Sequence, residues 1–153
     1  MQLSACDSAG PALEGGLVPR TTILLADDNS AVLDRLGKML ENERNYKVVA
    51  ALSDGATVVR DYLRLRPDVI LLDISLGEFS GIDIARQLRD SGCSAKIVFV
   101  TVHEDADYVN AAMGAGGSGY LVKSRLSLDL FSAIRAVLSN KLFVSPTLMY
   151  KSG

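Results

Sequence analysis

The chain has 153 residues, of which 48% are hydrophobic and 22% are charged, a composition typical of a globular domain with a sizeable core. Its 16 basic and 18 acidic residues give a net charge of −2, so no overall positive field favours nucleic-acid binding by the chain as given. No apolar run reaches the about 18 residues that a membrane span requires, and the N-terminal residues lack the pattern of a secretory signal.

The ends of the chain and its cysteines carry few signals. Residues 1–20 are rich in Gly, Pro, Ser and Ala and are predicted to form a flexible N-terminal tail. The two cysteines, Cys6 and Cys93, lie far apart, and neither has a second ligand at metal-binding spacing. We therefore expect a reduced, cytoplasmic protein with no membrane partner.

From Thr21 onward, short apolar runs alternate with longer amphipathic stretches. The apolar runs predict strands, which fall at 21–27, 48–52, 68–74, 96–102 and 120–123. These runs are almost continuously apolar, as is typical of strands buried on both faces of a sheet.

The stretches between and after these strands have apolar residues at helical spacing. They predict helices at 30–43, 54–66, 82–90, 105–113 and 127–139. Asn29 or Ser30 can cap the first helix, and Pro67 ends the second. The fourth is the weakest, because it is short and rich in alanine.

Five strands, each followed by a helix, predict an α/β fold: a doubly wound five-stranded parallel sheet flanked by five helices, with right-handed crossovers. In such sheets, function is expected beyond the carboxyl ends of the strands, near the point where the strand order reverses.

One glycine run matches the spacing G-x-G-x-x-G, through Gly114, Gly116 and Gly119. A dinucleotide site needs this motif after a strand and before a helix, because the phosphates lie on the helix N-terminus. Here the run follows a helix and precedes a strand. It is therefore predicted to end the helix in a tight turn and to direct Lys123 along the last strand.

Polar side chains stand where the predicted strands end, and they are Asp27, Asp28, Asp73, Thr101 and Lys123. Any one of them alone would be read as a cap or a solvated loop residue. Because parallel strands bring their carboxyl ends to one edge, we expect all of these side chains to lie together.

Three carboxylates at close range repel one another by about 4 kcal/mol per pair at an effective dielectric constant near 20. A hard divalent cation relieves this repulsion, and Mg²⁺ is commonly held by one or two carboxylates, a carbonyl and waters. The sequence predicts an Mg²⁺ site made by Asp28, Asp73 and the main-chain carbonyl of Ser75, with Asp27 contributing through water.

A carboxylate beside Mg²⁺ can attack a phosphoryl group and form an acyl phosphate. Lys123 would then meet the phosphoryl charge from the other side. Thr101 supplies a hydroxyl that can donate to a phosphoryl oxygen.

Four segments, LLADDNS (24–30), LLDISLGEFSG (71–81), FVTV (99–102) and GYLVKS (119–124), together resemble the receiver domains of two-component response regulators. The resemblance covers about 21–144 and implies a flavodoxin-like sheet in which the first strand lies between the second and the third.

The resemblance also implies a role for each matching residue. These are the phosphoacceptor Asp73, the acidic pair Asp27 and Asp28, the switch pair Thr101 and Tyr120, the phosphate-binding Lys123, and Gly81 at the start of the third helix. The implied partner is a sensor histidine kinase. Phosphorylation is expected to remodel the face made by the fourth helix, fifth strand and fifth helix. The protein is then no turnover enzyme, although it is expected to dephosphorylate itself.

Some residues depart from the family pattern. Val102 stands where a small residue is usual, and its bulk is predicted to restrict access to the phosphoryl group. Gly77 replaces a common proline, which loosens the phosphoacceptor loop. His103 is close enough in sequence to approach the site, but a lone loop histidine is expected to be exposed.

The C-terminal segment NKLFVSPTLM (140–149), with Ser124 after the lysine, resembles the NarL/FixJ regulators of the LuxR type. In that family the segment leads toward a helix-turn-helix domain that binds DNA. Residues 145–153 are therefore predicted to begin a linker or form a C-terminal tail, with the output domain missing from a truncated chain. A homodimer through the switch face or the last helix is a further expectation.

Other readings remain open at this stage. A receiver that serves only as a stand-alone or phosphorylation-independent interaction module retains the same fold. A phosphatase with an aspartate nucleophile needs a second acid two residues on, where this chain has Ser75. A flavodoxin-like electron carrier needs a hydroxyl-rich phosphate loop after the first strand, where this chain has two carboxylates.

Overall fold

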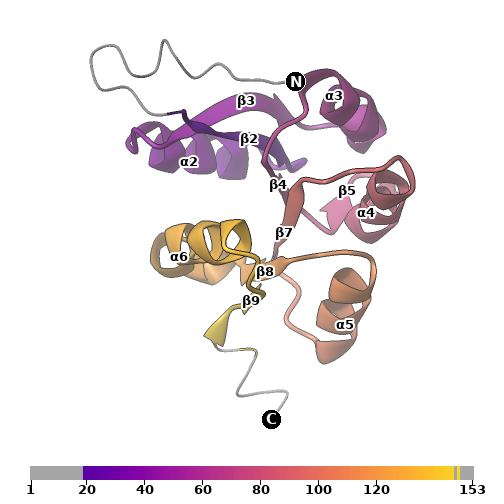
Figure 1. Ribbon diagram of the computed structural model, residues 1–153. Helices are drawn as coiled ribbons and strands as arrows, with labels where there is room; N and C mark the ends of the chain where they lie inside the picture. Colours follow the sequence, from indigo (N-terminus) through magenta and orange to yellow (C-terminus); the bar gives the residue numbers. More distant parts are fainter. Residues whose placement is uncertain (1–18, 147, 149–153) are drawn as a thin grey trace.

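The computed structural model describes residues 19–146 and Leu148 as a parallel sheet covered by helices on both faces (Figure 1). The predicted N-terminal tail lies almost wholly outside the described residues. None of the helices in this part of the chain is long and apolar enough to cross a membrane.

The main sheet has the order β3-β2-β4-β7-β8-β9, with every neighbouring pair parallel. Its strands are β2 (Thr21–Ala26), β3 (Tyr46–Leu52), β4 (Val69–Leu72), β7 (Lys96–Thr101), β8 (Gly119–Val122) and β9 (Phe143–Val144). The doubly wound parallel sheet and the strand order implied by the resemblance are confirmed. The predicted number of five strands is wrong by one, because β9 adds a short sixth strand at the edge.

The helices alternate with the strands as predicted. They are α2 (Ser30–Glu41), α3 (Val58–Leu65), α4 (Gly81–Asp90), α5 (Ala106–Gly114) and α6 (Leu126–Leu138). The predicted second helix differs most, because the 3-10 turn η2 (Gly55–Thr57) precedes α3 and the helix begins four residues later than predicted. The 3-10 turn η3 (Lys123–Arg125) precedes α6, whose two ends each lie within one residue of the prediction.

The core lies on both faces of the sheet, because successive strand residues point to opposite sides. In β2, Ile23 and Leu25 pack in one cluster with residues of α2 and α6, whereas Leu24 and Ala26 pack in the other with residues of α3, α4 and α5. Figure 1 shows the same division, with α2 and α6 on one side of the sheet and α3, α4 and α5 on the other. All four of these β2 side chains are buried, which explains why the strand reads as a continuous apolar run.

The glycine run is a turn between α5 and β8, as predicted. Gly116 has φ +106°, and a Cβ there would press on the side chain of Arg89. The Arg89 guanidinium donates to the carbonyls of Gly116, Cys93 and Ala95. A Cβ at Gly117 would press on the ring of Phe99. The glycines therefore make room for an arginine and an aromatic ring, which is a packing role.

Packing continues past residue 144 through a buried polar network. The Ser145 hydroxyl accepts from the Val122 amide (3.1 Å) and donates to Asp129 Oδ2 (3.1 Å). Arg125 Nε also donates to this carboxylate (2.8 Å). Leu148, 3% exposed, joins the core cluster that contains Tyr120. The chain after β9 is thus anchored to the end of β8 and the start of α6.

We expect Ser145→Ala to lower the free energy of unfolding by about 1–3 kcal/mol, because it leaves the buried Val122 amide without an acceptor. Urea denaturation measures the change. Ser132→Ala, at an exposed site on α6, is the matched control and should stay within about 0.5 kcal/mol of the parent. Equal stabilities for the two variants would contradict this reading of the network.

Candidate functional site

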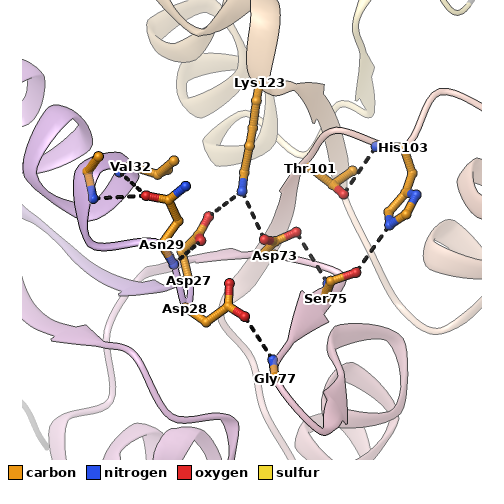
Figure 2. A network of polar contacts seen from close by, with 11 residues as sticks. Asp27, Asp28, Asn29, Val32, Asp73, Ser75, Gly77, Thr101, His103 and Lys123 are labelled. Atoms are coloured by element: carbon orange, nitrogen blue, oxygen red, sulfur yellow. Dashed lines mark hydrogen bonds and ion pairs between the residues drawn. The ribbon is translucent and has the colours of Figure 1, made fainter.

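The sequence-predicted site residues come together at the carboxyl ends of the strands (Figure 2). Asp27 directly follows β2, and Asp73 directly follows β4. Thr101 is the last residue of β7, and Lys123 directly follows β8. These strands are hydrogen-bonded neighbours in the order β2-β4-β7-β8, so their ends gather the side chains although the residues are far apart in sequence.

Asp27, Asp28 and Asp73 form an acidic cluster in which one oxygen from each carboxylate lies within 4.8 Å of the others. Asp27 and Asp73 are buried, 2% and 4% exposed, whereas Asp28 is exposed. Burial raises the pKa of Asp27 above its ordinary value, although contacts with Lys123 and the Asn29 amide oppose that rise. The cluster therefore concentrates negative charge where little water can stabilise it.

Lys123 provides the opposing charge. Its Nζ lies 2.8 Å from Asp27 Oδ2 and 2.9 Å from Asp73 Oδ2, and Figure 2 shows it reaching both carboxylates. Burial lowers the pKa of Lys123, but bonds to Asp27 and Asp73 outweigh this effect, so its pKa is raised overall. The lysine is therefore held as a cation between the two buried acids.

The backbone of two loops fixes the carboxylates. The Asn29 amide donates to Asp27 Oδ1 (2.8 Å), and the Gly77 amide donates to Asp28 Oδ2 (3.0 Å). Gly77 has φ +62°, a left-handed conformation that glycine adopts without strain. The Ser75 amide approaches Asp73 Oδ1 at 3.3 Å.

The donor set fits a hard divalent cation. It supplies oxygen atoms of three carboxylates at close range, and one of them, Asp28, is open to solvent. The buried Oδ2 of Asp27 is paired with the Lys123 ammonium, which lies 2.8 Å away.

A two-strand hairpin that the sequence did not predict follows Asp73. Its strands are β5 (Ser75–Leu76) and β6 (Phe79–Ser80), and they lead directly into α4. At the first residue of α4, a Cβ on Gly81 would overlap the main-chain carbonyl oxygen of Asp73. The Gly81 amide donates to the Ile74 carbonyl (2.6 Å). Only glycine lets the helix start this close to the Asp73 loop.

Thr101 and Tyr120 are both fully buried, at 0% exposure. They are connected through the main chain of His103. The His103 amide donates to Thr101 Oγ1 (3.3 Å), and the Tyr120 hydroxyl donates to the His103 carbonyl (2.8 Å). Burial raises the pKa of Tyr120, so its hydroxyl stays protonated and remains a donor. The ring of Tyr120 points inward in this conformation.

The expectation that His103 is exposed is wrong. Its side chain is half-buried, stacks on Tyr108 with ring centroids 4.1 Å apart, and places Nε2 3.1 Å from Ser75 Oγ. Sequence reasoning missed this contact, because nothing in the local pattern indicates which way a loop histidine turns. Val102 has 65% of its surface exposed, so its effect on access stays a prediction.

A family model described as the response regulator receiver domain matches residues 23–135. The chain belongs to this receiver family. The matched region contains the acidic cluster, Thr101, Tyr120 and Lys123, so the family match and the candidate site fall in the same part of the chain.

The receiver is also similar to individual regulators. It is 34% identical over 128 residues to the transcriptional regulatory protein DesR of Bacillus subtilis, covering 84% of this chain and 63% of DesR. It is 36% identical over 114 residues to the nitrate/nitrite response regulator NarP of Escherichia coli, covering 74% of this chain and 53% of NarP. The receiver therefore spans less than two thirds of either relative.

Among solved structures, the receiver resembles a LuxR-family two-component response regulator from Aurantimonas sp. SI85-9A1. The TM-score is 0.82 at 30% identity, over 86% of this chain and 94% of that structure. The predicted resemblance to receivers of NarL and LuxR regulators is confirmed.

We expect Gly81→Ala to destabilise the receiver by about 1–3 kcal/mol, because the added methyl group overlaps the Asp73 carbonyl and forces the loop to move. Urea denaturation of the variant measures the loss. Gly37→Ala is the matched control, since Gly37 lies in α2 and a Cβ there meets no neighbouring atom within 4 Å. It should stabilise the protein by up to about 1 kcal/mol through helix propensity. Opposite signs for the two variants are the expected result, and a stabilising Gly81→Ala would contradict it.

Proposed function

We propose that this receiver accepts a phosphoryl group on Asp73 from a sensor histidine kinase and thereby controls an output. The observation that supports this most strongly is the arrangement of Asp73 beside two further carboxylates and Lys123, within ion-pair distance of the lysine. An acceptor carboxylate, a cation site and a fixed positive charge are the parts that phosphoryl transfer needs.

In the proposal, Asp28, Asp73 and the main-chain carbonyl of Ser75 hold Mg²⁺, and Asp27 contributes through water. When bound, the ion neutralises charge on the phosphoryl oxygens during transfer. The backbone donors from Gly77 and Asn29 keep Asp28 and Asp27 oriented before any ion binds.

The transfer itself uses groups of this chain. An Asp73 carboxylate oxygen attacks phosphorus, and the bond between phosphorus and the kinase histidine nitrogen breaks, leaving an acyl phosphate. Lys123 stays near the new phosphoryl oxygens, because it already contacts Asp73 Oδ2 at 2.9 Å. The Thr101 hydroxyl, now bonded by the His103 amide, is the group that turns to donate to the phosphoryl oxygen.

The proposed output passes through Thr101 and Tyr120 to the face formed by α5, β8 and α6. Both side chains already share the main chain of His103, so movement of Thr101 acts on the loop that holds the Tyr120 hydroxyl. By similarity to the transcriptional regulator DesR, we propose control of transcription through a separate DNA-binding domain. Homodimerisation through the switch face or α6 belongs to the same proposal.

Receiver domains of transcription regulators are generally not turnover enzymes, and we propose that this one only loses its own phosphoryl group by hydrolysis. A phosphorylation-independent interaction module is the competing function. It requires none of the carboxylates, so the ion pairs that Lys123 makes with Asp27 and Asp73 give this alternative no support.

We expect one added phosphoryl group on the intact protein after incubation with Mg²⁺ and acetyl phosphate, because Asp73 is the acceptor. Intact mass spectrometry detects the addition, which should be labile to hydroxylamine. Asp73→Asn and chelation by EDTA should each abolish it. Asp83→Asn is the matched control, since Asp83 lies on α4 with an exposed side chain, and it should leave phosphorylation unchanged. A full addition in Asp73→Asn would overturn the assignment.

We expect Val102→Ala to speed both phosphorylation by acetyl phosphate and loss of the phosphoryl group, because it removes bulk next to Thr101. Time courses of the intact mass measure both rates. Rates equal to those of the parent protein would show that Val102 does not control access.

A further inference from the structure

The His103 side chain makes a contact between the loop after β4 and the loop after β7. Its Nε2 lies 3.1 Å from the hydroxyl of Ser75, at the start of β5, while its ring stacks on Tyr108 of α5 at 4.1 Å. Figure 2 shows the ring turned toward Ser75 from the loop after β7. The contact therefore connects the loop after Asp73 to the loop after Thr101.

Ser75 is the residue through which this contact would act. Its amide approaches Asp73 Oδ1 at 3.3 Å, and its main-chain carbonyl is a proposed Mg²⁺ ligand. Ser75 is exposed and belongs to a strand of only two residues that pairs with β6 alone. The neighbours Ile74 and Leu76 are buried in the core, and the bond to the half-buried ring of His103 adds a contact at the exposed Ser75 side chain between them.

We propose that His103 is a positioning residue for the phosphoacceptor site. Its bond to the Ser75 hydroxyl holds the Ser75 main chain in one orientation before the cation binds. In that orientation the Ser75 carbonyl would bind the cation, and the Ser75 amide donates to Asp73. The inference rests on the proposed function, since it assigns this residue to the same cation site. It predicts that His103 sets the Mg²⁺ requirement of the reaction without touching the phosphoryl group.

Two variants separate the hydrogen bond from the ring stacking. His103→Phe keeps a ring against Tyr108 but has no nitrogen to bond Ser75. His103→Gln loses the ring, while its amide can donate to or accept from the Ser75 hydroxyl. If the bond positions the site, the Phe variant is impaired and the Gln variant is rescued. If stacking alone matters, the order is reversed.

The expected effect lies in the Mg²⁺ dependence. In His103→Phe, the Mg²⁺ concentration for half-maximal phosphorylation by acetyl phosphate should rise about 2- to 10-fold, the range that one hydrogen bond supports. At saturating Mg²⁺ the rate should return to within about twofold of the parent, because the acceptor and Lys123 are intact. His103→Gln should remain within about twofold at all Mg²⁺ concentrations.

Ser75→Ala completes a double-mutant cycle. It should raise the Mg²⁺ requirement as much as His103→Phe, and the double variant should be no worse than either single one, because both remove the same bond. Additive effects would overturn the proposal, since they would mean that the two side chains act separately.

Two measurements are independent of phosphorylation. Calorimetry of Mg²⁺ binding should give the same 2- to 10-fold weakening in His103→Phe. In metal-free protein, the amide NMR signal of Ser75 should shift in His103→Phe and stay close to that of the parent in His103→Gln. An unmoved Ser75 signal or an unchanged Mg²⁺ affinity in His103→Phe would overturn the inference.

Failure of this inference can be distinguished from failure of the proposed function. If the parent protein is phosphorylated on Asp73 and His103→Phe has an unchanged Mg²⁺ requirement, only the role of His103 is lost. If the parent accepts no phosphoryl group, the proposed function fails, and calorimetry still decides whether His103 presets a cation site.

Discussion

The site depends on one charge balance, in which the Lys123 ammonium lies between two buried carboxylates. Two carboxylates that are 2% and 4% exposed, Asp27 and Asp73, are costly to bury side by side unless a cation lies close to both. The sheet supplies that cation by ending β8 immediately before Lys123, two strands away from β4 in the sheet. A group that enters this site therefore meets an existing balance of charges. In the proposed function, negative charge added to Asp73 would be met by Lys123, which lies 2.9 Å from Asp73 Oδ2, and by a cation held at the acidic cluster.

Much of the fold and most of this balance could be predicted from sequence, for a physical reason. Strands buried on both faces are continuously apolar, as in Val69–Leu72, so they stand out from amphipathic helices. Polar residues directly after such strands must lie at one edge of a parallel sheet. That rule predicts that Asp27, Asp73 and Lys123 lie together, as they do in the structure.

What sequence reasoning missed depends on contacts between distant loops. The strand β9 has only two residues, and its pairing is supported by the Ser145 network, which local periodicity cannot reveal. The hairpin after Asp73 is equally short. The direction of the His103 ring is set by Tyr108 and Ser75, which lie 5 and 28 positions away. No periodic pattern in the sequence links these positions to His103. Elements that have too few residues to show a period are fixed by tertiary contacts.

The two edge strands of the sheet differ in length, because β9 has two residues and β3 has seven. Unpaired edge strands can template pairing with other chains, and β9 covers the edge of β8 at Gly119 and Tyr120. The opposite border, β3, is seven residues long and carries the exposed Lys47, a charge of the kind that discourages such pairing. If β9 detached, β8 would become an exposed edge strand that could pair with strands of other chains. Secure anchoring of this short strand therefore serves the colloidal stability of the protein as well as its fold.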